Sequence, residues 1–311
     1  MDLLIKGGMI IDGTGSPGFF GAVGVDRDTV SILRGDVSAI EASRVIDATG
    51  KIVSPGFIDV HAHSALMILH DPQHLPKVHQ GVTTELIGVD GNSYAPFTNR
   101  RDLEDFIQLN AGLDGAPPID PWWSSVSEYL ANYDEKVSVN IAYIVGNSPI
   151  RISAMGWNDR RPTRLESDRM RGLLRESMEE GSIGMSTGLD YPPGSYADTD
   201  ELVDLSKEVA RLGGIYHTHA RYTLGDRFLD PYREAIEIGR RSGVPVHLTH
   251  MLPKAAFPGS SMRLIELVEE ANNEGLDVTF DCFPYTHGGT RLLFFLPQWT
   301  HDGGIPRIYE V

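Results

Sequence analysis

Two histidines one residue apart, His61 and His63, are the residues of this chain best suited to chemistry. They close the apolar run 57–60, which predicts a strand, and a Pro-Gly turn precedes that run. Side chains alternate faces along a strand, so residues two apart point the same way. We therefore expect the two imidazoles to project together and to share a metal ion, because imidazole is a common zinc ligand. The pair alone is weak evidence, because packed histidines can have the same spacing.

Three further candidate ligands stand at other predicted strand ends. His219 closes a strand at 214–219, His250 closes one at 246–250, and Asp90 follows one at 82–88. In α/β barrels the carboxyl ends of the strands converge on one face, where active sites are built. Four histidines and one carboxylate at such ends predict an N/O metal site for one or two divalent ions, with zinc the first candidate.

The elements that must position these residues fall into two regions. Short apolar runs separated by Gly, Asp and Pro predict a small antiparallel β unit over residues 1–54. After residue 55, strands alternate with amphipathic segments, which predicts an α/β fold with a parallel sheet, either open or closed into a barrel. The expected strands are 57–63, 82–88, 139–145, 183–187, 214–219, 246–250 and 278–283. The expected helices include 164–180, 199–212, 229–242 and 261–274.

The second region, residues 55–311, has one strand fewer than a closed barrel requires. A (β/α) barrel needs eight strands, and only seven are recognisable before residue 311. We expect the sequence to be the front portion of a longer protein or a truncated form of one. The segment at about 94–136 is longer than an ordinary connection and is expected to be an excursion that covers the mouth of the barrel.

Composition limits the kinds of partner. The formal net charge of −16 argues against nucleic acid and against anionic membranes. The single cysteine, Cys282, excludes an intrachain disulfide. No signal peptide is apparent, and no apolar run approaches the roughly 18 residues of a membrane helix. We expect a soluble, cytoplasmic protein with a small-molecule substrate; the sequence does not predict an oligomeric state.

Four other polar residues lie near the predicted site. His217 shares the parity of His219 one layer deeper and is expected to be a packed or supporting residue. His247 has the opposite parity to His250 and is expected to face the helices. Asp281, on the seventh strand, has either a core or a site role. Asp59 either orients His61 or is a simple buried hydrogen-bonding group.

Several motifs carry a family resemblance. Residues 4–15, 45–51 and 55–63 resemble the amidohydrolase superfamily, in which a small β-sandwich precedes a metal-dependent, TIM-like (β/α) barrel. Residues 188–197, 214–219 and 281–285 are similar to the N-acyl-D-amino-acid deacylases. The most specific of these motifs is Tyr191-Pro192-Pro193-Gly194-Ser195-Tyr196. The resemblance implies that residues 1–54 are a β-sandwich segment and that residues 55–311 are the catalytic barrel.

The resemblance also implies roles for individual residues. His61, His63, His219 and His250 match the family's metal ligands, and Tyr191 matches a tyrosine placed near the substrate carbonyl. The deacylases carry Gly-Asn-Cys-Gly after the second strand, and its cysteine is a zinc ligand. Here the corresponding residues are Gly88-Val89-Asp90-Gly91. Aspartate is a harder donor than thiolate, but it still binds divalent metals, so Asp90 is expected to ligate.

Two further departures concern catalysis and substrate binding. The family's catalytic aspartate comes from the last barrel strand, which lies beyond the seven recognised here. The lysine expected two residues after the sixth-strand histidine is Leu252. Lys254, Arg221 and Tyr285 are therefore the candidates for binding the substrate.

The expected function is metal-dependent amide hydrolysis. A metal-activated water would remove the acyl group from an N-acyl-D-amino acid, with Zn²⁺ or another divalent ion as cofactor. One alternative is another amide substrate, cyclic or N-acyl. The other is a truncated, metal-binding chain without turnover.

Overall fold

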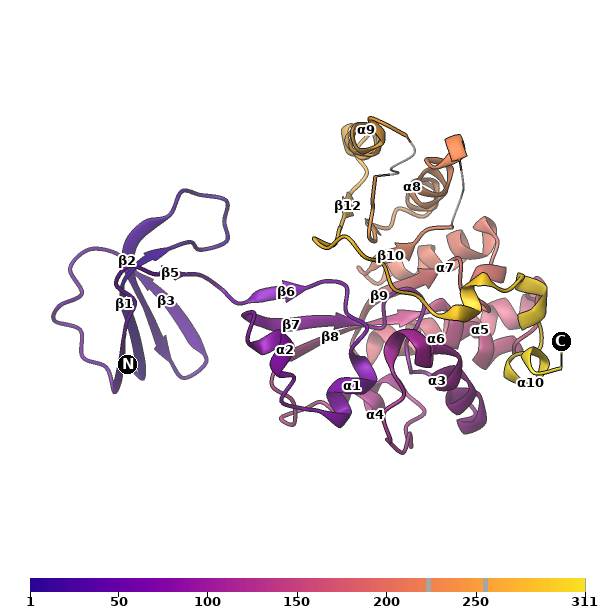
Figure 1. The fold of residues 1–311 in the computed structure, drawn as a ribbon, viewed down its shortest axis with the longest axis horizontal. Coiled ribbons are helices and arrows are strands. Elements are labelled where there is room, and N and C mark those ends of the chain that lie inside the picture. The colour runs from indigo at the N-terminus through magenta and orange to yellow at the C-terminus, as the bar shows by residue number, and fades with distance from the viewer. Residues whose placement is uncertain (222–224, 254–256, 311) are drawn as a thin grey trace. The chain divides into compact units, whose positions relative to one another are not determined.

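The computed structural model describes residues 1–221, 225–253 and 257–310, which form two compact units. The first unit is Met1–Phe57 and the second is Ile58–Val311. One sheet of five strands belongs to the N-terminal region, and a second sheet of seven strands to the rest (Figure 1). Within the described residues, no helix has the length and apolar character needed to cross a membrane.

The N-terminal unit is a single mixed sheet centred on β1. Its strands are β1 (Leu3–Ile10), β2 (Phe19–Asp26), β3 (Thr29–Leu33), β4 (Arg44–Asp47) and β5 (Ile52–Val53). β1 pairs antiparallel with β2 but parallel with β4 and β5. The expectation of an antiparallel unit is therefore wrong for β4 and β5. Strand and turn residues identify each strand, but they do not identify the partner beside which a longer connection places it.

The second unit is built on a curved, mainly parallel sheet. Its strands are β6 (Phe57–Asp59), β7 (Val82–Ile87), β8 (Asn140–Gly146), β9 (Ser182–Gly188), β10 (Ile215–His219), β11 (Val246–Leu248) and β12 (Val278–Phe280). Their spatial order follows the chain from β6 to β12, and the strands from β7 onward run parallel to their neighbours. The predicted α/β class and all seven predicted strands are confirmed.

Three strands, β6, β11 and β12, end two or more residues earlier than the sequence predicts, and two of these ends affect predicted ligands. β6 ends at Asp59 and β11 at Leu248, so the histidines beyond them lie outside the ladder. In both β6 and β11, an aspartate carboxylate accepts the hydrogen bond from the backbone N–H of the histidine that follows the strand. The His61 N–H donates to Asp59 Oδ1 (3.0 Å), and the His250 N–H donates to Asp281 Oδ1 (2.6 Å). Asp59 thus holds the backbone of His61 and does not touch its ring nitrogens.

Helices connect successive strands. The α-helices are α1 (Ala65–His70), α2 (Leu75–Val78), α3 (Arg100–Asp114), α4 (Val126–Leu130), α5 (Asn147–Met155), α6 (Arg164–Glu179), α7 (Thr199–Arg211), α8 (Asp230–Ser242), α9 (Ser260–Asn273) and α10 (Ile305–Ile308). The 3₁₀ turns are η1 (Gly194–Tyr196), η2 (Gly225–Arg227), η3 (Leu292–Phe295) and η4 (Gln298–His301). Local signals explain the starts: Thr163 forms a capping box with Glu166 at α6, and Asp198 caps α7.

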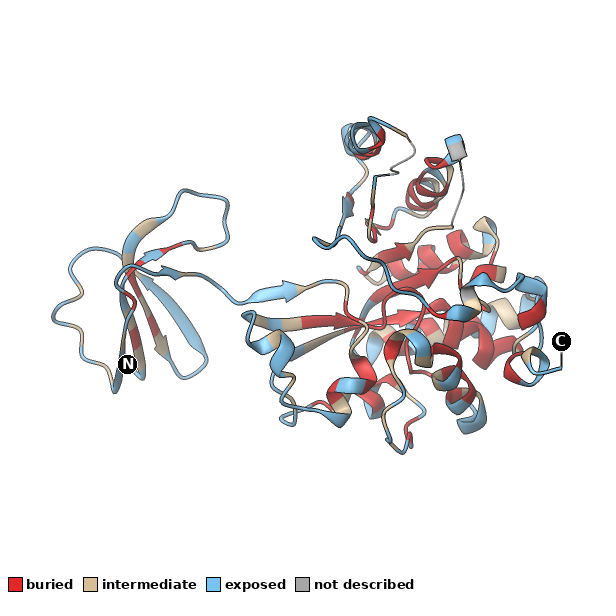
Figure 2. Cartoon of the chain, in the orientation of Figure 1, coloured by how far each residue is buried: buried red, intermediate tan, exposed pale blue. Residues whose placement is uncertain are grey.

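The core of the second unit lies between this sheet and its helices, as the buried residues in Figure 2 show. The segment 94–136 belongs to it, because α3 and α4 bring Phe106 and Tyr129 into full burial. Phe106 packs against Phe97, and Tyr129 against Trp123. This aromatic packing fixes the C-terminal end of α3, where Asp114 reaches the site described next.

Candidate metal centre

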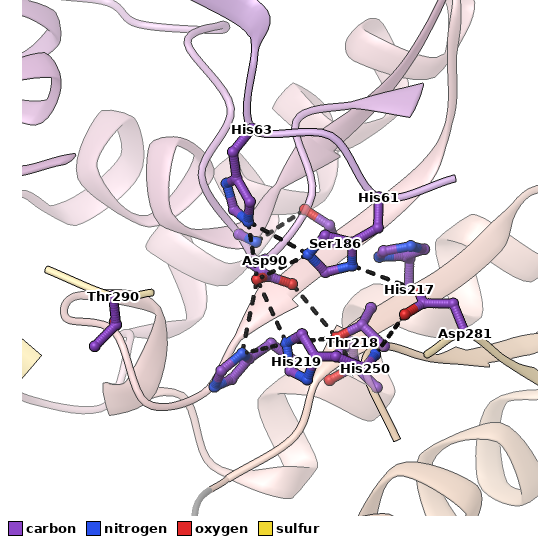
Figure 3. Close-up of polar contacts among 12 residues, drawn as sticks. His61, His63, Asp90, Ser186, His217, Thr218, His219, His250, Asp281 and Thr290 are labelled. Carbon is purple, nitrogen blue, oxygen red and sulfur yellow. Dashed lines mark hydrogen bonds and ion pairs between the residues drawn. The ribbon is translucent and has the colours of Figure 1, made fainter. Parts of the chain in front are cut away.

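The five predicted ligands come together at the carboxyl ends of four strands. His61 and His63 follow β6, Asp90 follows β7, His219 ends β10, and His250 follows β11. Figure 3 shows the four imidazoles arranged around the Asp90 carboxylate. Residues up to 189 positions apart in the sequence thus share one site, as the barrel topology requires.

Asp90 is the hub of the cluster. Its Oδ2 lies 3.3 Å from His61 Nε2 and 3.4 Å from His63 Nε2. The same oxygen lies 3.7 Å from His219 Nδ1 and 3.7 Å from His250 Nε2. The imidazoles also contact each other in two pairs. The His61 and His63 Nε2 atoms are 3.3 Å apart, and His219 Nδ1 is 2.8 Å from His250 Nε2.

These separations fit a divalent metal. Donors bound tetrahedrally at the usual zinc distances are about 3.3 Å apart. One ligand atom each from His61, Asp90 and His250 lies within 4.8 Å of the others. The donor set is imidazole and carboxylate, which suits zinc and also harder divalent ions. A carboxylate between two imidazole pairs can serve one ion or bridge two.

The turn that carries Asp90 is held very close to the neighbouring strands. Asp90 itself has a left-handed backbone with φ of 55°. Ser186 on β9 bonds both ends of this turn, accepting from the Gly91 N–H (3.0 Å) and donating to Gly88 O (2.5 Å). A Cβ at Gly188 would lie 2.0 Å from Asp90 O. Glycine at the end of β9 is therefore required for the turn to reach the site.

A carboxylate contacts the outward nitrogen of three imidazoles. His63 Nδ1 is 2.9 Å from Asp114 Oδ1, and His219 Nε2 is 3.0 Å from Asp190 Oδ2. His61 Nδ1 is 3.4 Å from Asp281 Oδ2. Such partners fix the tautomer and orientation of metal-binding histidines. Sequence reasoning missed Asp114 and Asp190 in this role. Asp190 lay within a recognised motif, whereas Asp114 had no local signal.

His247 is not where its parity predicts. Its ring stacks on that of His217 at 4.8 Å, and its Nε2 lies 3.1 Å from Asp281 Oδ2, on the site side of the sheet. The expectation that His247 faces the helices is therefore wrong. It was counted from His250, but His250 has a φ of 33° and lies beyond β11, where alternation no longer holds. His217 pairs in register with His247, as neighbours on one face do.

The family model described as the amidohydrolase family matches residues 44–276. The chain belongs to the amidohydrolase family. It is 36% identical over 294 residues to D-aminoacylase and 33% identical over 297 residues to N-acyl-D-glutamate deacylase, both from Alcaligenes xylosoxydans xylosoxydans. Each match covers 94% of this chain and 59% of the relative. The chain therefore spans less than two thirds of the length of these curated relatives.

A solved structure agrees with this assignment. N-acyl-D-glutamate deacylase from Bordetella bronchiseptica, complexed with zinc and a phosphonate inhibitor, superposes with a TM-score of 0.80 at 32% identity. The superposition covers 91% of this chain and 58% of that chain. The predicted resemblance to amidohydrolases is confirmed.

The carboxylates in the site of this amidohydrolase favour binding of protons or of a metal cation by the histidines. Burial opposes protonation of His61, but Asp90 and Asp281 raise its pKa to about 10. Burial likewise opposes protonation of His63, whose pKa Asp114 and Asp90 raise to about 9. The pKa of Asp90 is held well below its usual range, since the surrounding imidazoles outweigh its burial. A divalent ion would thus compete with protons for these nitrogens.

His219 and His217 differ although they are two residues apart on β10. Burial opposes protonation of His219, but Asp190 and Asp90 raise its pKa to about 9. Burial, together with the charges of His247 and His61, lowers the pKa of His217 to about 3. His217 is therefore a neutral ring beneath a charged cluster.

The residues predicted to contact the substrate differ in burial and in their contacts in this amidohydrolase. Tyr191 is buried with its ring 4.7 Å from that of His219. Arg221 is engaged, because its Nε donates to Glu234 (3.0 Å) and its Nη1 to Ser195 O (3.0 Å). Tyr285 is 61% exposed and stacks on Phe283. Lys254 lies outside the described residues.

Proposed function

We propose that this chain carries the metal centre and part of the substrate site of an amide hydrolase that deacylates N-acyl-D-amino acids. The convergence of four imidazoles on the buried Asp90 is the observation that carries the proposal. The similarity to D-aminoacylase and N-acyl-D-glutamate deacylase supports the choice of substrate. The proposed metal is zinc, as one ion or two, held by His61, His63, Asp90, His219 and His250.

The residues of the chain divide the remaining work. When bound, the metal lowers the pKa of a coordinated water and polarises the amide carbonyl. Asp114, Asp190 and Asp281 hold three of the ligand imidazoles through their outward nitrogens. Tyr191 donates a hydrogen bond to the carbonyl oxygen as negative charge develops there. Burial and the charge of Asp90 raise its pKa to about 12, so the hydroxyl keeps its proton at neutral pH.

The general base is not assigned to a described residue. The family resemblance places it on the eighth barrel strand, beyond the seven strands described. Metal binding by this chain needs only the described ligands, whereas hydrolysis also needs a general base. The two properties need separate measurements.

The test is elemental analysis combined with an assay for release of D-amino acid from N-acyl-D-amino acids. We expect near-stoichiometric zinc in the purified chain and its loss in the double variant His219→Ala, His250→Ala. His79→Ala, an exposed histidine outside the cluster, is the matched control and should retain the metal. A well-folded wild-type chain that binds no zinc under saturating conditions would contradict the proposal.

A second candidate is hydrolysis of another amide, cyclic or N-acyl. It is favoured by Asp90 and Leu252, which stand where the resembling deacylases carry cysteine and lysine. Assaying a cyclic amide beside an N-acyl-D-amino acid separates the two candidates. Zinc binding with turnover of neither substrate would instead identify a metal-binding chain without activity.

A further inference from the structure

Arg291 is a buried arginine that pairs with no carboxylate among the described residues. It follows β12, is 4% exposed, and donates through Nη1 to the neutral Asn110 Oδ1 on α3. Its Nη2 is buried and has no hydrogen-bond partner within the described part of the chain. Its guanidinium Cζ lies 4.2 Å from the centre of the Tyr191 ring. An aromatic face attracts a cation but does not neutralise it.

A second buried arginine, Arg151, has the carboxylate partner that is not found for Arg291 among the described residues. Arg151 is 0% exposed, and its Nη1 bonds both carboxylate oxygens of Glu201, at 2.6 and 2.5 Å. Its Nη2 donates to Arg160 O at 3.0 Å. Buried charges are normally paired because removal from water is costly. Arg291 has the burial of Arg151, but no described carboxylate pairs with it.

Arg291 contacts the tyrosine that the proposed function places at the substrate carbonyl. Arg291 packs on Tyr191, whose ring in turn packs on that of His219. The preceding residue, Thr290, has its hydroxyl 3.4 Å from Tyr191 Oη. Figure 3 shows Thr290 on the segment that follows β12. A group bound by the Arg291 guanidinium would therefore lie beside Tyr191, whose hydroxyl the proposed function aims at the scissile carbonyl.

We propose that Arg291 is the anion receptor of this site and binds the α-carboxylate of the substrate. The proposal rests on the proposed function, which supplies the acyl group and the amide. In an N-acyl amino acid a single carbon separates the amide nitrogen from the carboxylate, which matches a receptor packed directly on Tyr191. Arg221, the other described candidate, is already held by Glu234 and by Ser195 O. An arginine edge is also well shaped to bind a carboxylate.

The test compares an acid with its amide in binding. Levulinate is the ketomethylene analogue of N-acetylglycine, so it has the carbonyl and the carboxylate but no bond to hydrolyse, and levulinamide lacks the charge. We expect the zinc-loaded wild type to bind levulinate at least about tenfold more tightly than levulinamide, as a charged hydrogen bond provides. NMR titration gives both dissociation constants.

Arg291→Met should weaken levulinate binding by about 10- to 100-fold and leave levulinamide within about threefold. Arg291→Lys keeps the positive charge but loses the planar pair of N–H donors. Its affinity for levulinate should therefore lie between those of the wild type and Arg291→Met. The matched control is Arg263→Met, which removes an exposed arginine packed on Phe228 and should change neither constant. Thermal unfolding of each variant establishes that it is folded.

The outcomes separate this proposal from the proposed function. Equal binding of levulinate and levulinamide by the wild type overturns the role of Arg291, whether or not N-acyl-D-amino acids are hydrolysed. A parallel loss of both probes in Arg291→Met overturns it as well, because a structural role predicts that pattern. Selective loss of levulinate supports the receptor even if no N-acyl-D-amino acid is hydrolysed, in which case only the proposed function fails.

Discussion

At the residue scale, the centre depends on carboxylates that lie behind the imidazoles. Asp114 illustrates this, since one oxygen contacts His63 Nδ1 and the other accepts from the Tyr94 hydroxyl at 2.6 Å. Both are buried, so the ring of His63 has a single orientation. Removing such a partner typically lowers metal affinity without removing a ligand.

We predict that Asp114→Asn lowers zinc affinity by about 10- to 100-fold, because the amide holds the His63 tautomer less firmly. Competition with a chromophoric chelator measures the change. Asp105→Asn is the matched control, a buried aspartate on the same helix that pairs with Arg101. Equal affinities for the two variants would show that Asp114 does not orient a ligand.

Asp90 is predicted to decide which metals bind. Asp90→Asn removes the negative charge at the hub and should lower zinc affinity by about tenfold or more. Asp90→Cys should retain zinc but lose affinity for manganese, because thiolate is a softer donor than carboxylate. Parallel titrations with Zn²⁺ and Mn²⁺ test this. An unchanged ratio of the two affinities in Asp90→Cys would contradict a ligand role.

The sequence predicted residues that stand directly at strand ends and missed those that arrive from elsewhere. His219 and Asp90 were named as candidate ligands because they stand at the end of a predicted strand or directly after one. Asp114 and Arg291 were missed, because their proximity to the centre depends on how α3 and the segment after β12 pack. No local pattern records such long-range contacts.

At the element scale, Arg221 secures a turn. Its Nη1 donates to Ser195 O within η1 and its Nη2 to Ala197 O just after η1, while its Nε donates to Glu234 on α8. This turn is the second half of the tyrosine motif, residues 191–196, recognised in the sequence. Arg221 thus positions the loop beside Tyr191.

We predict that Arg221→Met lowers the free energy of unfolding by about 1–3 kcal/mol, because carbonyls and a carboxylate lose a charged donor. Denaturant titration measures this. Arg227→Met, which removes an exposed arginine that pairs with the nearby Asp230, should change stability by about 0.5 kcal/mol or less. If Arg221→Met selectively abolished binding of the levulinate acid, the anion receptor would be Arg221 and not Arg291.

Elements were predicted well where the signals were local and poorly where they were not. The helices α6 and α7 begin at the predicted positions 164 and 199, where Thr163 and Asp198 cap them. The ends of β6 and β11 were misplaced because aspartate side chains, and not turn residues, replace the ladder there. Pairing of β1 with β4 and β5 depended on a crossover that strand patterns do not encode.

At the scale of the whole molecule, the metal-free protein should be least stable at high pH. His61, His63 and His219 have folded pKa values of about 10, 9 and 9, against an ordinary 6.5. A raised pKa contributes stability that is complete below about 6.5 and is lost as the pH rises through the folded values. The melting temperature of the metal-free protein should therefore fall between pH 7 and pH 9.5.

Calorimetry of metal-free and zinc-loaded protein across this range tests the prediction. Zinc replaces the protons, so the loaded protein should lose much less stability over the same interval. Equal slopes with and without zinc would show that other groups cause the pH dependence and that the centre does not.

The carboxylate of Asp90, at the position where the resembling deacylases have a thiolate, affects how well the centre should retain its metal under oxidative stress. The resembling deacylases place a cysteine at this position, and sulfur ligands convert to sulfenic and sulfinic acids when peroxide reaches them. Here the only sulfhydryl of the chain, Cys282, is exposed and is not among the proposed ligands. A carboxylate has no comparable oxidation chemistry, so peroxide concentrations that strip metal from a thiolate centre should leave this one loaded.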